Sequence, residues 1–150
     1  MWKKAALLTL CGGLFLGALS AQSNDRLDEL LAQAPARLDS TAYLVLSAAK
    51  LVPETASPGD AFDAAVAAGL IAKTSKPEGT VSVQDLSYLL MKSLKLTGGL
   101  EWTFFPNPRA AYRELVYREA ANGSGGPDRV VAGDEVVRTL TAVQGSRSDQ

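Results

Sequence analysis

The chain has 150 residues, of which 47% are hydrophobic and 21% are charged, as in an ordinary globular domain. This composition excludes wholesale disorder and a polytopic membrane protein, and the length allows one domain with a single modest core. The formal net charge is −1, and no strongly basic segment accompanies it. We therefore expect no nucleic-acid partner.

The residue types that are missing exclude several kinds of chemistry. The sequence has no His, and its one Cys is Cys11, inside the N-terminal apolar segment. Ser-His-Asp and Cys-His nucleophiles, His or Cys zinc sites and disulfides are therefore excluded for the rest of the chain. We expect no catalytic residue, no metal site and no cofactor.

Residues 1–21 have the three regions of a secretory signal peptide. Lys3 and Lys4 supply the positive charge, residues 5–19 are apolar, and small residues at 18–21 suit cleavage. The apolar stretch is shorter than the roughly 20 residues that span a bilayer, so we expect no membrane span in the mature chain. We predict export to the periplasm or cell envelope of a bacterium. The alternatives are a retained anchor and lipidation at Cys11, although Leu10 stands where a small residue is expected.

Without the signal peptide, residues 22–144 predict an all-α domain of about six helices, followed by a flexible tail over residues 145–150. Pro35, Pro53 and the pair Gly98–Gly99 are expected to end helices, and Ser82 to begin one. The expected helices cover residues 25–34, 39–52, 57–70, 82–96, 109–121 and 133–143.

The sequence matches itself at two offsets. A shift of 50 residues pairs Phe62 with Tyr112 and Leu90 with Leu140, and places Pro58, Ala61, Val66, Pro77 and Val81 on identical residues. A shift of 45 residues pairs residues 38–51 with residues 83–96, including Lys50 with Lys95. These matches predict three repeated helical hairpins, the first of them truncated. The alternative is coincidence between helices of simple composition.

These repeats resemble surface-layer homology repeats. The resemblance rests on a helix that ends near residues 69–71, a turn with Pro77, and a second helix opened by Val81, Ser82 and Asp85, with a similar copy at Pro127, Val131 and Glu135. It covers residues 38–144 in three degenerate copies, and small exported helical proteins of spirochaetes are also similar. It implies repeated helical hairpins and binding of anionic cell-wall polysaccharide.

The sequence departs from that family at the positions that hold the polysaccharide. The family opens the second helix with a Thr-Arg pair, whereas this chain has Ser82–Val83 and Ala132–Gly133 there. The resemblance therefore implies the fold more than the ligand.

Residues 100–109 concentrate aromatic and proline residues between two expected helices. A proline-fixed aromatic loop can anchor a protein partner or stack on sugar rings. Alternatively, it folds back over the core between the repeats. The candidate partner-binding residues are Trp102, Phe104, Phe105, Pro106 and Arg109.

Three other kinds of site have weaker support. Glu101, Asp128, Asp134 and Glu135 are the candidate carboxylates for a glycan hydrolase, but Asp134 and Glu135 open a helix and suit its N-terminal dipole. Residues 124–134 lack the alternating ligands of an EF-hand. The glycines at 123–126 lack the lysine of a phosphate-binding loop and are typical of a turn.

The function that these observations favour is a noncatalytic interaction or scaffold module whose partner is another envelope protein. The alternative is a module that binds peptidoglycan or another cell-wall polysaccharide. A carboxylate-dependent glycan hydrolase is the third hypothesis.

Overall fold

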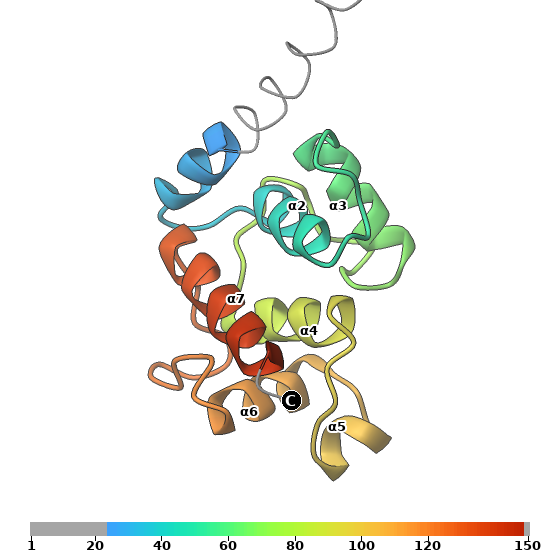
Figure 1. Ribbon diagram of the computed structural model, residues 1–150, viewed down its shortest axis with the longest axis vertical. Helices are drawn as coiled ribbons and strands as arrows, with labels where there is room; N and C mark the ends of the chain where they lie inside the picture. The colour runs from blue at the N-terminus through green and yellow to red at the C-terminus, as the bar shows by residue number, and fades with distance from the viewer. Residues whose placement is uncertain (1–23, 149–150) are drawn as a thin grey trace, which may run out of the picture.

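The computed structural model describes residues 24–148, and every regular element in that range is helical (Figure 1). The predicted all-α class is confirmed. None of the helices in this range is long and apolar enough to cross a membrane. The predicted signal peptide and Cys11 lie outside the described residues. A first helix covers residues 24–31, and the others are α2 (Leu38–Ala48), α3 (Pro58–Ala67), α4 (Val83–Ser93), α5 (Leu100–Phe104), α6 (Pro108–Tyr117) and α7 (Gly133–Ser148).

Local capping residues explain where three of these helices begin. Ser57 and Asp60 form a reciprocal capping box at the start of α3, where Pro58 occupies the first turn. The Ser82 hydroxyl accepts the Asp85 N–H at the start of α4, as predicted, and Asn107 caps α6 in the same way. Asp39 or Ser40 was expected to cap α2, but this expectation is wrong, because α2 begins at Leu38 and the Asp39 carboxylate pairs with Arg37.

Helices α2, α3, α4 and α6 end with the same backbone arrangement. After each helix, one residue adopts a positive φ, and the next residue donates its N–H to the carbonyl five residues back, for example Leu51 to Leu46 and Leu96 to Met91. The positive-φ residues are Lys50, Gly69, Lys95 and Glu119. Three of the four are not glycine. The predicted ends of α2 near residue 52, of α3 at residue 70, of α4 at residue 96 and of α6 at residue 121 are therefore wrong by three or four residues. The first helix likewise ends at residue 31 and not at residue 34.

Two further boundaries differ from the sequence prediction. The aromatic stretch is not all loop, because residues 100–104 form the short helix α5. The last helix does not end near Val143 but continues to Ser148, so residues 145–148 of the expected tail are helical. Gly145 lies inside that helix, which shows that a glycine in an exposed last turn need not end it.

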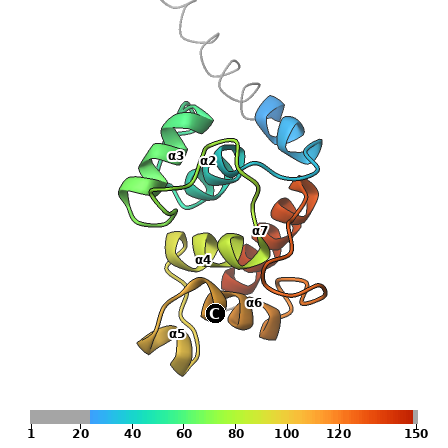
Figure 2. The same cartoon turned by 180° about the vertical axis from the view of Figure 1, so that it is seen from behind.

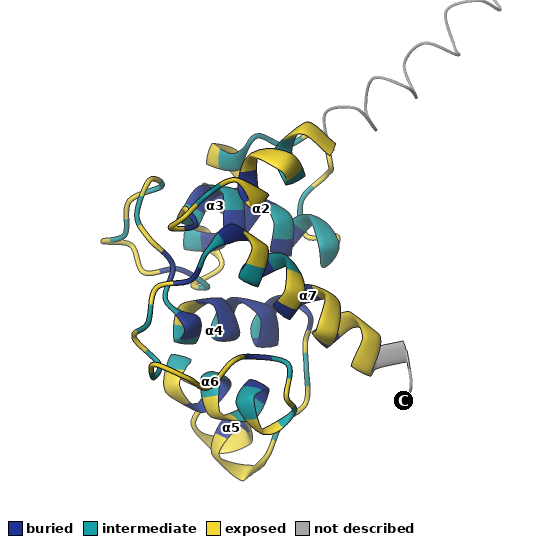
Figure 3. Ribbon diagram, turned by 90° about the vertical axis from the view of Figure 1, so that its left-hand side faces the viewer, coloured by how far each residue is buried: buried dark blue, intermediate teal, exposed yellow. Residues whose placement is uncertain are grey.

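The helices pack as two groups joined through α4 and α7. Helix α2 packs against α3, and α4 packs against α6, with α5 beside α6 at one end of the molecule (Figures 1 and 2). Helices α4 and α7 both contact α2, which joins the groups. Helix α4 is buried on most of its surface, whereas α5 and the C-terminal part of α7 are largely exposed (Figure 3).

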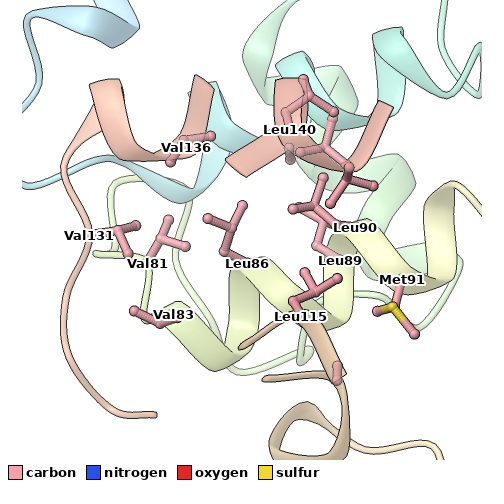
Figure 4. Packing of buried hydrophobic residues seen from close by; sticks show 14 of the residues in the cluster. Val81, Val83, Leu86, Leu89, Leu90, Met91, Leu115, Val131, Val136 and Leu140 are labelled. Atoms are coloured by element: carbon pink, nitrogen blue, oxygen red, sulfur yellow. The ribbon is translucent and has the colours of Figure 1, made fainter. Parts of the chain in front are cut away.

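Three short extended segments meet at the centre of the molecule. The Ala36 N–H donates to the Val131 carbonyl and the Val131 N–H donates to the Val81 carbonyl, at 2.9 and 3.0 Å. All three side chains are buried, and Figure 4 shows Val131 and Val81 side by side, with Leu86 and Val136 next to them. The core therefore forms where these three distant parts of the sequence come together.

Candidate functional site

Trp102 fixes the short helix α5 to the body of the protein. Its side chain is only 8% exposed, and its indole N–H donates to the Leu96 carbonyl at 3.2 Å. The Tyr88 ring meets it edge to face, with centroids 6.0 Å apart, and the Lys92 amine lies 5.5 Å from the indole centroid. Trp102 was predicted to contact a partner, but in this conformation it is a buried anchor with little surface to offer.

Polar contacts join α5 to α6. The Arg113 guanidinium donates to both oxygens of Glu101 at 3.0 Å. The Glu114 carboxylate accepts the Gly99 N–H at 2.9 Å, just before α5 begins, and pairs with Arg118 at 2.8 Å. A methyl group on Gly98 would lie 2.6 Å from the Trp102 ring, so the chain can reach this position only with glycine. Helix α5 is therefore held in one orientation although it is only five residues long.

Three large apolar side chains remain exposed on and beside this helix. Leu100, Phe104 and Phe105 are 78%, 68% and 72% exposed. We call these three residues the α5 surface. Helix α5 lies at one end of the molecule (Figures 1 and 3), and the side chains of the α5 surface are exposed there. Pro106 is exposed directly after it and leads to the cap of α6.

An exposed stripe on α6 accompanies the α5 surface. Arg109, Arg113 and Tyr117 are spaced by four residues and so share one side of the helix. Arg113, the middle residue of the stripe, contacts α5 through its ion pair with Glu101. Tyr117 is 86% exposed. The structure thus adds Leu100 and Tyr117 to the predicted residues, and the four-residue spacing from Arg109 was the signal for Tyr117.

The candidate carboxylates have separate partners. Glu101 pairs with Arg113, Asp134 with Arg138 and Glu135 with Arg129, while Asp128 accepts a hydrogen bond from Gln84. The bond to Glu135 is the main cause that raises the pKa of Arg129. Three of the four candidate carboxylates are thus held in ion pairs, each with a different arginine.

A groove lies between the end of α3 and the start of α4. It has a volume of about 460 Å³ and a mainly apolar floor that includes Val66, Leu70, Ile71, Leu89 and the Tyr88 ring. Lys73, Ser75 and Asp85 add polar groups. The groove can hold a ligand with both apolar and hydrogen-bonding surface.

The described residues contain no group of three or more His, Cys, Asp or Glu side chains placed to bind a metal ion. Comparisons with protein-family models, with curated proteins and with solved structures found no match. The resemblance to surface-layer homology repeats therefore stays a prediction of the sequence, and a functional assignment has to start from the geometry of the α5 surface and the groove.

Proposed function

We propose that this protein is a noncatalytic interaction module of the bacterial envelope that binds another envelope protein through the α5 surface. The observation that carries the proposal is the exposure of Leu100, Phe104 and Phe105 on a helix that Trp102 holds rigidly. A preorganised apolar surface loses little conformational entropy when a partner covers it.

The residue types around the α5 surface also support a protein partner. Aromatic residues and arginine are enriched where protein interfaces carry most of their binding energy. Here the exposed phenylalanines lie beside a helical stripe that contributes Arg109, Arg113 and Tyr117. The surface thus combines an apolar centre with a polar and cationic margin, which is the usual anatomy of a protein interface.

The predicted export and the predicted repeats are part of the same proposal. Residues 1–21 support export by their sequence pattern alone. The repeats are supported by two equivalent hydrogen bonds: the Leu38 N–H donates to the Gly79 carbonyl, and the Val83 N–H donates to the Arg129 carbonyl. The two donors are 45 residues apart and the two acceptors 50 residues apart, which are the two offsets at which the sequence matches itself. The positive-φ residues Lys50 and Lys95 are separated by the same 45 residues.

A second candidate function is binding of a cell-wall glycan, and the groove beside α3 and α4 favours it. Sugar rings present an apolar face and a ring of hydroxyl groups, so they suit an aromatic ring flanked by charged and hydroxyl side chains. Tyr88, Asp85 and Lys73 supply such groups here. Asp85 already bonds to the Ser82 hydroxyl, which leaves fewer free acceptors for a sugar.

A paired capture and sedimentation experiment tests both candidates. The chain without residues 1–21 is immobilised and incubated with envelope extract, and in parallel is sedimented with purified peptidoglycan. The informative variant is Phe104→Ser with Phe105→Ser, because both side chains are exposed and the change leaves the core intact. Leu51→Ser is the matched control, since Leu51 is also exposed but lies beyond α2.

We expect a protein that the wild type and Leu51→Ser capture and the double variant does not. Equal capture by all three would exclude the α5 surface as the contact site. Sedimentation with peptidoglycan that survives the double variant but is lost on Tyr88→Ala would favour the glycan-binding function instead. Circular dichroism must show that each variant keeps its helical content.

A further inference from the structure

The charges around the α5 surface are unbalanced. Glu101 and Glu114, the acidic residues within α5 and α6, are each paired with an arginine, and the exposed Glu119 lies beyond the end of α6. Lys95 and Arg109 are exposed and form no ion pair with any described residue. Lys95 precedes Leu96, whose carbonyl binds the Trp102 indole, and Arg109 lies one turn before Arg113. An exposed, unpaired cation therefore precedes α5 in the chain at Lys95 and another follows it at Arg109.

This arrangement argues against the insertion of α5 into a lipid bilayer. Glu101 lies on α5 between Leu100 and Phe104, and its ion pair with Arg113 is about half exposed to solvent. Burying the apolar residues in hydrocarbon would carry this ion pair toward the bilayer, where both charges would lose hydration. A protein partner can bury the apolar side chains and leave the ion pair at a hydrated margin.

The charges also argue against a second copy of this chain packing on the same surface. A twofold-symmetric contact would bring Lys95 and Arg109 of two copies toward each other. Unscreened like charges at an interface oppose association. The same two cations instead favour a partner with carboxylates at matching positions, and the guanidinium of Arg109 can bind a carboxylate through two hydrogen bonds.

From these charges and from the projecting shape, we propose that the α5 surface binds an apolar pocket that is rimmed by Asp and Glu side chains on the partner protein. This inference rests on the proposed function and specifies the partner's chemistry. Phe104 and Phe105 enter the pocket, and Lys95 and Arg109 contact the acidic rim. Because α5 projects from the molecule (Figure 3), the concave half of the interface belongs to the partner.

The test first identifies the partner and then measures the charge dependence of binding. A photo-crosslinking phenylalanine derivative replaces Phe105 in the full chain, in cells that make the protein, and the crosslinked protein is identified and purified. Its affinity is measured by isothermal titration at 50 and 500 mM NaCl for the wild type and for Lys95→Glu with Arg109→Glu. Glu is compatible with the positive φ at Lys95, because Glu119 adopts the equivalent conformation after α6.

The control variant is Lys50→Glu with Lys76→Glu, which changes the net charge equally at exposed positions outside the α5 and α6 region. We expect charge reversal at Lys95 and Arg109 to weaken binding at least about tenfold at low salt, and the control to change it less than about twofold. High salt should weaken binding of the wild type and reduce the difference between the variants.

Other outcomes overturn the inference in distinguishable ways. One such outcome is that Phe104→Ser with Phe105→Ser abolishes binding while charge reversal at Lys95 and Arg109 leaves the affinity unchanged. This result would refute the acidic rim but not the proposed function. No crosslinked protein, or equal binding by all variants, would refute both. Sedimentation of the wild type with vesicles of phosphatidylglycerol and phosphatidylethanolamine, lost on charge reversal, would assign the surface to lipid. Crosslinking to a second copy of the chain would assign it to self-association.

Discussion

Replacing Gly133 with alanine should open the contact between the first helix and α7. A methyl group on Gly133 would overlap the backbone carbonyl of Leu30, with the carbonyl carbon only 2.6 Å away. The obstacle is backbone, so no side-chain rotation can relieve the overlap and the two segments must separate. The Gly133 N–H also donates to the Gln33 carbonyl at 2.9 Å, which is part of the same close approach.

The magnitude follows from the contacts that this separation breaks. Loss of the Gly133 hydrogen bond and of the neighbouring bond from Ala36 to Val131 costs about 1 kcal/mol each. Leu30 is 1% exposed, and exposing part or all of its side chain costs about 1–3 kcal/mol more. We therefore expect Gly133→Ala to lower the free energy of unfolding by about 3–5 kcal/mol, a large share of the stability of a small domain.

Urea unfolding followed by circular dichroism measures this change, and hydrogen exchange of residues 24–36 shows whether the first helix detaches alone. Gly145→Ala is the control, because a methyl group at Gly145 meets nothing within 4 Å and should stabilise α7 by about 0.5–1 kcal/mol. The reasoning would be refuted if the free energy of unfolding of Gly133→Ala lay within about 0.5 kcal/mol of the wild-type value and hydrogen exchange of residues 24–36 were unchanged. In that case, the close approach of Gly133 to Leu30 would not constrain the fold.

Three further predictions concern single contacts. Trp102→Ala should lower the free energy of unfolding by about 2–4 kcal/mol in a thermal melt, since it removes a buried anchor; an unchanged melt would mean that α5 does not depend on it. Glu135→Gln should lower the free energy of unfolding, measured with urea, by about 0.5–1.5 kcal/mol, because the ion pair between Glu135 and Arg129 is mostly buried. An unchanged free energy of unfolding would show that this ion pair does not stabilise the fold. The hydrogen bonds from Ser57 lower the pKa of Asp60 in the folded protein. The ionised carboxylate therefore stabilises the fold at any pH above its unfolded-state pKa of about 4. This stabilisation is lost as the pH falls through the lower pKa of the folded state. In Ser57→Ala, the free energy of unfolding should therefore fall less between about pH 5 and pH 2 than in the wild type. An equal fall in both proteins, measured by urea unfolding at each pH, would contradict this.

Features that depend on neighbouring residues were predictable from the sequence. The caps at Ser57 and Ser82 bond to backbone three residues away, so the sequence specifies them directly. The buried positions of α4, such as Leu86 and Leu90, follow from helical spacing. The helix ends were harder, because Lys50 and Lys95 adopt a conformation that glycine normally marks.

The candidate site needed the tertiary structure. The sequence marked residues 100–109 as unusual but did not show which of their side chains face solvent. That depends on the contacts of Trp102 with the Tyr88 ring and the Leu96 carbonyl. Once Trp102 is fixed, the rest of α5 turns Phe104 and Phe105 outward.

The all-α class and the starts of α3 and α4 were thus determined by the sequence itself, because hydrophobic spacing and capping hydrogen bonds act within a few residues. Only the tertiary structure decided that Ala36, Val81 and Val131 meet at the centre and that Gly133 must pass against the Leu30 carbonyl. Those contacts join segments 45 to about 100 residues apart in the sequence, so no local pattern specifies them.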